Sequence, residues 1–309
     1  MNNYKIYQKI KSLVDLFEAE KIDGYTFSPY TDNNGFWLAE KIITEVNYHK
    51  AYEKFISEIE PILDAFSVFE QCSIDLVGQS FMIQKLNDNE EAYIYFYFSR
   101  KTDTVSMCYL KEDFDKIRKL INNRAEMGLY FMREVNQTSS AYSRLALLLV
   151  VVESLAKDSQ KRICDNKDCK NFNNFYSTTD KDNLKKILGD DLYKKIYSGE
   201  RPIRNRLFHG RFISREEFVG FLENIYKRII EYYNLQFDLK IQDIVMGPRV
   251  FDDSNEGGKY FLKCIDIENL NFDDLYKSFD SEEMIKKDFV EKYHLVADKN
   301  LIKTLYKNY

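Results

Sequence analysis

An apolar segment near the middle of the chain constrains the fold more than any other part of the sequence. Residues 140–157 read SAYSRLALLLVVVESLAK, and the stretch from Leu145 to Val152 holds no polar residue. A membrane span needs about 20 such residues, so this stretch is too short to cross a bilayer. A helix that is apolar nearly all round instead belongs at the centre of a bundle. The segment therefore predicts a helical bundle; the alternative is a strand over 145–152, since valine weakens helical preference.

Several helix signals follow this segment. Residues 179–188 read as a short helix with Thr179 as its N-cap and Gly189 as its stop. Pro202 suits the first turn of a later helix, and Gly210 suits its end. Gly and Pro are scarce, at 11 and 4 of 309 residues, which argues for long helices.

A capping box begins the last helix of this region. Ser214 is followed three residues later by Glu217, which is the spacing at which the two side chains cap the helix start. Apolar side chains then recur at helical spacing: Phe218, Leu222, Ile225, Ile229 and Tyr233. We therefore expect residues 125–235 to form one helical domain.

The flanking regions carry signals of both helix and strand. Apolar periodicity predicts helices over 4–20, 36–66 (interrupted by Pro61) and 112–122. Runs of β-branched or aromatic residues predict strands over 81–86, 92–100 and 104–110, and a turn at 87–90 joins the first two strands. Residues 237–267 alternate and carry Gly-Gly, which favours a β-hairpin, and residues 270–309 read as one or two helices.

The sequence thus predicts an α+β protein that is mainly α-helical. We expect an N-terminal α/β domain of unknown role over 1–122, a helical domain over 125–235, and a small C-terminal extension of hairpin and helix over 236–309. No segment resembles a signal peptide, and five scattered cysteines favour reduced thiols, so we expect a cytoplasmic protein without a membrane partner.

Charge is distributed unevenly along the chain. The net charge of −5 argues against a nucleic-acid partner. However, residues 157–215 hold 15 Lys/Arg against 8 Asp/Glu, a net of +7, whereas residues 236–309 hold 11 against 15, a net of −4. The basic middle of the chain is therefore where an anionic partner is expected.

The segment RPIRNRLFHG, from Arg201 to Gly210, lies in this basic region and holds one of only three histidines. Cutting RNA without a metal needs a base for the ribose 2′-OH, a cation for the transition-state charge and an acid for the leaving 5′ oxygen. Histidine suits both proton steps because its ordinary pKa is about 6.5. Arginine suits the phosphate because its planar fork donates two parallel hydrogen bonds. Arg204 and His209 are therefore the candidate catalytic pair.

The spacing of these two residues poses a geometric problem. On a straight helix, side chains five residues apart point about 140° apart, whereas Asn205 and His209 share a face. A helix that ends at His209 would free the direction of that side chain. A second copy of the chain, related by a two-fold axis, is the other solution, because it brings two histidines and two arginines to one phosphate.

With its flanking helices, RNRLFHG resembles the signature of the HEPN (higher eukaryotes and prokaryotes nucleotide-binding) domains, in which a His lies five places after an Arg that is followed by a polar residue. The apolar helix LLLVVVESLAK, with its Glu153, is similar to the helix that precedes this motif in many bacterial members. The resemblance covers residues 125–235. It implies a helical bundle that acts as a metal-independent endoribonuclease with a composite site in a homodimer, in a toxin–antitoxin or anti-phage role. It also implies Arg204 and His209 as the catalytic pair, with Asn205 orienting His209 or touching the phosphate.

Further residues are expected to support this site. Glu153 either pairs with an arginine of the motif or faces water at its helix end. Surface lysines Lys181, Lys185 and Lys186 are solvating or line a groove for the RNA backbone. The basic residues expected to bind RNA are Arg201, Arg206, Arg211, Lys194 and Lys195.

The expected partners are RNA, a second copy of the chain, and an antitoxin or defence-system protein, with no cofactor and no metal. One alternative is a catalytically silent module that binds RNA or scaffolds a defence complex, and another is a toxin target or an antitoxin partner. Cys164 and Cys169 lack a second ligand pair for zinc. YIYFYF, residues 93–98, is either a sheet strand or a stacking platform for RNA bases.

Overall fold

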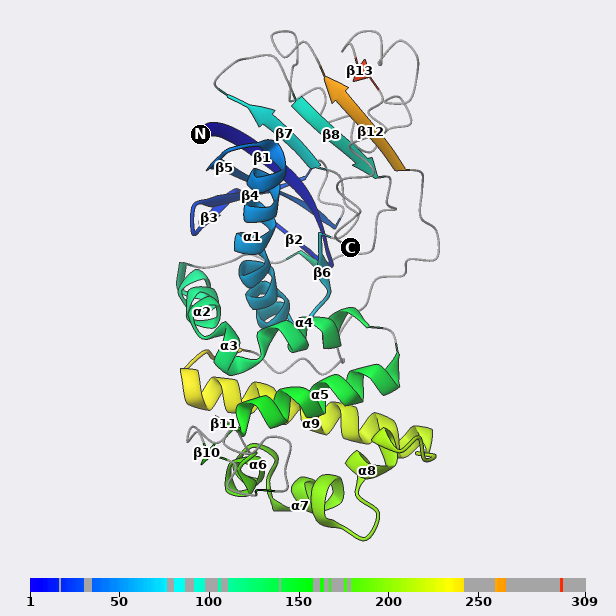
Figure 1. The fold of residues 1–309 in the computed structure, drawn as a ribbon. Helices are drawn as coiled ribbons and strands as arrows, with labels where there is room; N and C mark the ends of the chain where they lie inside the picture. Colours follow the sequence, from blue (N-terminus) through cyan, green and yellow to red (C-terminus); the bar gives the residue numbers. More distant parts are fainter. Residues whose placement is uncertain are drawn as a thin grey trace. The chain divides into compact units, whose positions relative to one another are not determined.

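The computed structural model has an α+β fold built from two compact units (Figure 1). It describes residues 1–16, 18–30, 35–76, 81–86, 92–97, 105–106, 111–138, 140–157, 162–163, 167, 175–176, 179–241, 259–264 and 295–296. The first unit comprises Met1–Leu63, Ser73–Phe114 and Phe251–Tyr309, and the second comprises Asp64–Cys72 and Asp115–Val250. Each unit is therefore assembled from segments that are separate in the sequence.

The first unit contains a nine-stranded sheet in the described part of the chain, with the order β13-β12-β8-β7-β1-β5-β4-β3 and β6 paired with β1. Its strands are β1 (Asn2–Ser12), β3 (Glu20–Ile22), β4 (Tyr25–Pro29), β5 (Phe36–Glu45), β6 (Ile74–Asp75), β7 (Phe81–Lys85), β8 (Ala92–Tyr97), β12 (Lys259–Cys264) and β13 (Leu295–Val296). All of these neighbours pair antiparallel. Two short strands, β2 (Val14–Asp15) and β9 (Val105–Ser106), pair parallel beside it.

The helices predicted over residues 4–20 and at the start of 36–66 are wrong, because these stretches form β1 and β5. Their register pairs Lys9 with Leu38 and Ile10 with Trp37. From Ile6 to Ser12 every residue of β1 is buried, so the strand lacks the alternation of polar and apolar residues that marks a half-exposed strand. Lys9 is fully buried with its Nζ 4.0 Å from the centroid of the Phe36 ring, a cation–π contact that keeps a charged residue inside the sheet.

A long helix, α1 (Tyr48–Glu70), follows the first strands and continues through Pro61, where an interruption was expected. In the first unit it packs against the sheet: the Tyr25 hydroxyl donates to the carbonyl of Phe55 at 2.7 Å. The Tyr52 and Phe81 rings stack with centroids 4.3 Å apart. The predicted strands over 81–86, 92–100 and 104–110 are confirmed as β7, β8 and β9 at their described residues.

The second unit is mainly helical. It contains the end of α1 and most of α2 (Lys111–Asn122). Its other helices are α3 (Arg124–Met127), α4 (Leu129–Gln137), α5 (Ala141–Leu155), α6 (Lys181–Leu188), α7 (Asp190–Tyr193), a π-helical segment η1 (Lys194–Ser198), α8 (Ile203–Phe208) and α9 (Arg215–Phe237). Residues Arg162–Ile163 (β10) and Phe175–Tyr176 (β11) add one short antiparallel pair.

The apolar segment forms α5, so the predicted helix is confirmed and the strand alternative is wrong. It packs against α4 and α9, and Figure 1 shows α5 and α9 running alongside each other. Leu145, Leu149 and Val152 are completely buried, as are Ile225 and Ile229 of α9. The periodic apolar residues of α9 therefore meet the apolar surface of α5, which is the hydrophobic contact that defines this unit.

Polar side chains are also buried in the second unit. The Asn136 Nδ2 donates to the Ser67 carbonyl at 2.9 Å and to its Oγ at 3.1 Å, and the Tyr226 hydroxyl donates to Asn136 Oδ1 at 3.0 Å. All three residues are buried. Because buried polar groups are stable only when hydrogen-bonded, this network fixes α9 and α4 against the end of α1.

The helix caps agree in part with the sequence. Ser214 accepts a hydrogen bond from the Glu217 amide, which confirms the predicted start of α9. The predicted cap at Thr179 is wrong, because Asp180 accepts from the amides of Asp182 and Asn183 instead.

Several predicted elements, most of them in the C-terminal region, fall outside the described residues. The turn at 87–90, most of the hairpin over 237–267 and most of residues 270–309 are not described. Of the described part, Lys259–Cys264 pairs with β8, and Leu295–Val296 is a strand where helix was expected. Among the helices that the structure describes, none combines the length and the apolar character of a membrane span.

Candidate functional site

The basic motif lies on α8, a short helix with a sharp end. The amide of Gly210 donates to the carbonyl of Leu207 at 3.2 Å, and the amide of Arg211 donates to the carbonyl of Arg206 at 2.8 Å. Gly210 has a φ of 65°, the left-handed conformation that glycine adopts at little cost. These features form a Schellman motif with His209 as the C-cap. The expected helix end beside Gly210 is therefore present, and His209 lies where the chain leaves the helix.

Arg204 is held by a carboxylate from another helix. Its Nε donates to Glu153 Oε1 at 2.6 Å, and the Tyr197 hydroxyl donates to the same oxygen at 3.3 Å. Glu153 comes from α5, Tyr197 from η1 and Arg204 from α8, so three elements converge on one carboxylate. Of the two alternatives for Glu153, the structure has the pair with a motif arginine. Sequence reasoning missed Tyr197, which no spacing connects to the motif.

The electrostatics of this cluster favour a fixed, charged Arg204. The hydrogen bond to Glu153 raises the pKa of Arg204 above its ordinary value. Burial, together with the charge of Glu153, raises the pKa of Tyr197 well above its ordinary value, so the phenol remains a donor. In the described part of the chain, the two terminal nitrogens of Arg204 make no hydrogen bond. The guanidinium is thus oriented through Nε while its terminal nitrogens stay available to a ligand.

The π-helical segment η1 positions Tyr197. It closes at Gly199, where a Cβ atom would lie 3.1 Å from the carbonyl oxygen of Lys194, a close approach that favours glycine. π-Helical turns are rare and are found frequently at functional sites. Here the turn brings a half-buried tyrosine to Glu153 while Lys194 and Lys195 stay exposed.

His209 is exposed, and its ring forms no hydrogen bond or ion pair with any residue that the structure describes. Its backbone amide donates to the Asn205 carbonyl at 3.0 Å, but among the described residues the Asn205 and His209 side chains form no hydrogen bond with each other. Likewise, within one chain the Arg204 and His209 side chains form no hydrogen bond with each other among the described residues. Their proximity at a shared phosphate remains a prediction.

The expected RNA-binding residues fall into two groups. Lys194, Lys195, Arg201 and Arg211 are exposed, and within the described residues none of them forms an ion pair. Arg206 is different: its Nη1 and Nη2 donate to the two carboxylate oxygens of Glu217 at 2.7 and 3.0 Å, and Nη2 also donates to the Phe212 carbonyl at 2.7 Å. Arg206 therefore joins α8 to the start of α9, in addition to any contact with RNA.

Exposed aromatic side chains flank His209. Phe208 is 53% exposed and Phe212 is 80% exposed, an unusual exposure for large apolar residues. The Phe208 ring centroid lies 5.3 Å from Arg204 Cζ. The surface around His209 therefore offers both positive charge and apolar area.

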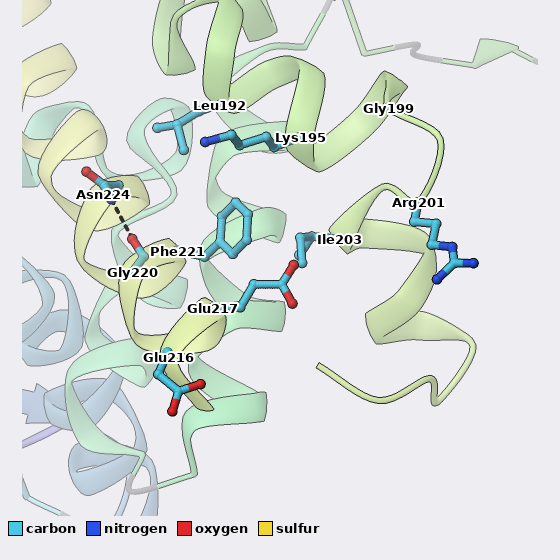
Figure 2. Close-up of a pocket in the computed structure, with 10 residues that line it drawn as sticks. All are labelled: Leu192, Lys195, Gly199, Arg201, Ile203, Glu216, Glu217, Gly220, Phe221 and Asn224. Atoms are coloured by element: carbon cyan, nitrogen blue, oxygen red, sulfur yellow. Dashed lines mark hydrogen bonds between the residues drawn. The ribbon is translucent and has the colours of Figure 1, made fainter. Parts of the chain in front are cut away.

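A pocket of about 530 Å³ opens between η1, α8 and the first half of α9 (Figure 2). Sequence reasoning did not find it, because its walls come from segments that are separate in the sequence. Arg204 and His209 do not line it. The residues that line it are Leu192, Lys195, Gly199, Arg201, Ile203, Glu216, Glu217, Gly220, Phe221 and Asn224.

Other candidate sites have little support in the described part of the chain. Among those residues, no three His, Cys, Asp or Glu side chains are grouped as a metal site requires. Cys164 and Cys169 lie outside the described residues. YIYFYF contributes to β8, a strand between β7 and β12. Of the three surface lysines on α6, Lys185 forms an ion pair, with its Nζ 3.8 Å from Asp190 Oδ1.

Comparison with known proteins gives no match: no protein-family model, no curated protein and no solved structure is similar to the chain. The resemblance to HEPN domains therefore remains a prediction from the motif and its neighbouring helices.

Proposed function

We propose that the protein is a metal-independent endoribonuclease of HEPN type. The observation that carries the proposal is the arrangement of Arg204, whose Nε is held by Glu153 at 2.6 Å while its terminal nitrogens have no partner in the described residues. A guanidinium oriented in this way is suited to receive a phosphate oxygen by two parallel hydrogen bonds. The exposed His209 on the same short helix supplies the group that transfers protons.

In this mechanism the ribose 2′-OH attacks the adjacent phosphorus. His209 removes the 2′ proton or donates a proton to the leaving 5′ oxygen, and Arg204 stabilises the charge on the phosphate oxygens. The P–O5′ bond breaks as the O2′–P bond forms. The products are a 2′,3′-cyclic phosphate and a 5′-hydroxyl end. No water and no metal takes part in this step.

The active form is a homodimer. One step needs both a base and an acid, and α8 offers a single histidine. Two copies that meet across a two-fold axis at α8 would supply two histidines and two arginines. The exposed Phe208 and Phe212 beside His209 supply the apolar area that such a contact would bury.

The exposed cations Lys194, Lys195, Arg201 and Arg211 would hold the flanking RNA backbone. Arg206 would contribute mainly by holding α8 against α9. A nuclease of this kind needs restraint in the cell, so a toxin or anti-phage role with an antitoxin or defence-system partner in the cytoplasm follows from the same proposal.

The test is RNA cleavage in EDTA by the full-length protein. Wild type should cleave single-stranded RNA to ends with a cyclic phosphate, and His209→Ala should reduce the rate by about 10²–10⁴-fold. Arg204→Ala should reduce it by about 10²–10³-fold. His49→Ala and Arg118→Ala, which change an equivalent side chain on α1 and α2, serve as matched controls and should cleave at the wild-type rate.

One observation favours the catalytically silent alternative: Glu153 partly neutralises the charge of Arg204. Under that alternative the protein retains RNA on a filter without cutting it, and His209→Ala binds as well as wild type. Cleavage by wild type that His209→Ala and Arg204→Ala leave intact would exclude the proposed site. Sedimentation of the wild type as a monomer at the assay concentration would exclude the composite site.

A further inference from the structure

The pocket beside α8 contains apolar and acceptor side chains that the proposed cleavage site does not use. Its volume of about 530 Å³ lies within the range of about 300–1,000 Å³ that is typical of small-molecule sites. Its walls are two facing segments: the stretch from Leu192 to Ile203, and the stretch of α9 from Glu216 to Asn224. Figure 2 shows the Phe221 ring in the middle of these residues, with Lys195 on one side and Glu216 on the other.

Three kinds of group line the pocket. Leu192, Ile203 and Phe221 form an apolar wall. Lys195 and Arg201 are cations without an ion pair in the described part of the chain, although Figure 2 shows the Arg201 side chain pointing outward at the edge of the pocket. Lys195 and the apolar wall thus lie within one pocket, with Arg201 at its edge.

The third kind of group accepts hydrogen bonds. The carboxylate of Glu216 has no partner among the described residues. The Asn224 Nδ2 donates to the Gly220 carbonyl at 2.6 Å, and Figure 2 shows its amide oxygen pointing away from Phe221. Glu217 is already neutralised by Arg206. The pocket therefore offers the cation of Lys195, an apolar wall and the free carboxylate of Glu216.

We propose that this pocket binds one nucleotide unit whose base carries an exocyclic amine. The phosphate lies at Lys195, the base lies against Phe221 and Ile203, and the amine donates to Glu216. An apolar ligand would leave Lys195 and Glu216 without partners. A bare phosphate would leave the apolar wall and the acceptors unused, and a longer polyanion inside the pocket would meet the charge of Glu216.

The bound nucleotide is part of the RNA strand whose scissile phosphate lies at Arg204. This identification of the ligand rests on the proposed function. Two connections link the pocket to that site. Ile203 in the wall is adjacent to Arg204 in the chain, and η1 supplies both Lys195 to the pocket and Tyr197 to Glu153. A strand with its scissile phosphate at Arg204 can therefore place a neighbouring nucleotide in the pocket, which makes the pocket a determinant of cleavage position.

Calorimetric titration of full-length His209→Ala tests the binding separately from cleavage. The probes are adenosine, cytidine and uridine monophosphate and inorganic phosphate. Adenosine or cytidine monophosphate should bind more tightly than uridine monophosphate, whose base has no amine, and more tightly than phosphate. Lys195→Ala should weaken all the nucleotides by about tenfold, as expected for the loss of a charge-assisted hydrogen bond. Glu216→Gln replaces the carboxylate by a neutral amide, a weaker acceptor, and should therefore reduce the preference for the amine-bearing bases. Lys119→Ala on α2 and Glu223→Gln, an exposed α9 residue outside the pocket, are the matched controls and should bind as the parent does.

Nucleotides that bind no better than phosphate, or unchanged binding in Lys195→Ala and Glu216→Gln, would overturn the proposal. Cleavage by the protein with an intact His209 then identifies the source of the nucleotide. A Glu216→Gln variant that cuts with an altered base preference supports an RNA subsite, whereas an unchanged preference rejects the RNA strand as the source. If wild type cuts no RNA and yet binds the monophosphates through Lys195 and Glu216, the proposed nuclease fails while the nucleotide pocket stands.

Discussion

Replacing Glu153 by Gln tests whether this carboxylate holds Arg204 in place. Glutamine nearly matches glutamate in size but carries no charge, so the packing at the end of α5 is kept. The Arg204 Nε then loses the charged acceptor at 2.6 Å, and the Tyr197 hydroxyl loses the one at 3.3 Å. Both stability and the orientation of the guanidinium should therefore change.

The magnitude follows from exposure and hydrogen bonding. The Arg204 side chain is 41% exposed and that of Glu153 is 28% exposed, and for an ion pair this exposed, solvent screening limits the contribution to about 0.2–1 kcal/mol. A hydrogen bond to a charged group contributes about 1 kcal/mol more than one between neutral groups, which the Tyr197 hydroxyl would forfeit. We expect Glu153→Gln to lower the free energy of unfolding by about 1–2 kcal/mol.

Urea denaturation followed by far-ultraviolet circular dichroism measures this change, because the second unit is mainly helical. The single tryptophan, Trp37, lies in the first unit, so its fluorescence follows that unit separately. Glu231→Gln, which removes an exposed pair with Arg228 on α9, is the control and should cost less than about 0.5 kcal/mol. A double-mutant cycle with Arg204→Gln should give a coupling energy of at least about 0.5 kcal/mol. A coupling energy near zero, or a loss no larger than that of the control, would refute the reasoning.

Three further predictions concern other contacts in the second unit. Tyr226→Phe removes a buried donor to Asn136 and should cost about 1–3 kcal/mol of unfolding free energy; an unchanged urea midpoint would show that the network is not needed. Arg206→Lys cannot reproduce the two hydrogen bonds to Glu217 of α9, so hydrogen exchange of the backbone amides between α8 and α9 should accelerate. The salt dependence of RNA binding should stay the same in this variant. Arg211→Ala, in contrast, should reduce the slope of log affinity against log salt concentration by about 1. Burial raises the pKa of Tyr226 and Tyr233 above the ordinary value, so the folded chain keeps protons that the unfolded chain releases, and stability should fall as pH rises above about 10. Tyr233→Phe should make this alkaline loss smaller, and a stability that stays flat between about pH 9 and 11 would contradict the assignment.

The helical unit was largely predictable from local sequence patterns. The all-round apolar segment of α5, the capping box at Ser214 and the glycine after His209 each specify local structure through a few neighbouring residues. The first unit was less predictable. In β1 the burial of both faces removes the alternation that identifies a strand, and the polar residues Gln8 and Lys9 lie inside the sheet. The burial of Gln8 and Lys9 depends on contacts with distant segments, which the local sequence pattern does not reveal.

The residues of the candidate site also differ in how far the sequence predicts them. Arg204 and His209 stand out in the sequence because their chemistry suits RNA cleavage. Tyr197 and Phe221 do not, because one acquires its role through a π-helical turn and the other through the approach of η1 to α9. Glu217 was recognised as a capping residue, but its second role, as the partner of Arg206, depends on where α8 ends. Contacts between distant segments are what the sequence pattern alone leaves open.

The pairing of β12 with β8 has a consequence for synthesis of the protein. The ribosome completes α2 through α9 before it reaches residues 259–264, so the helical unit can fold while one edge of the sheet still lacks its neighbour. An open strand edge is a template for unwanted pairing with other chains. A nascent chain that stalls or is cut after α9 would therefore combine a folded helical unit with an aggregation-prone sheet, and removal of β12 should be more harmful to solubility than its length suggests.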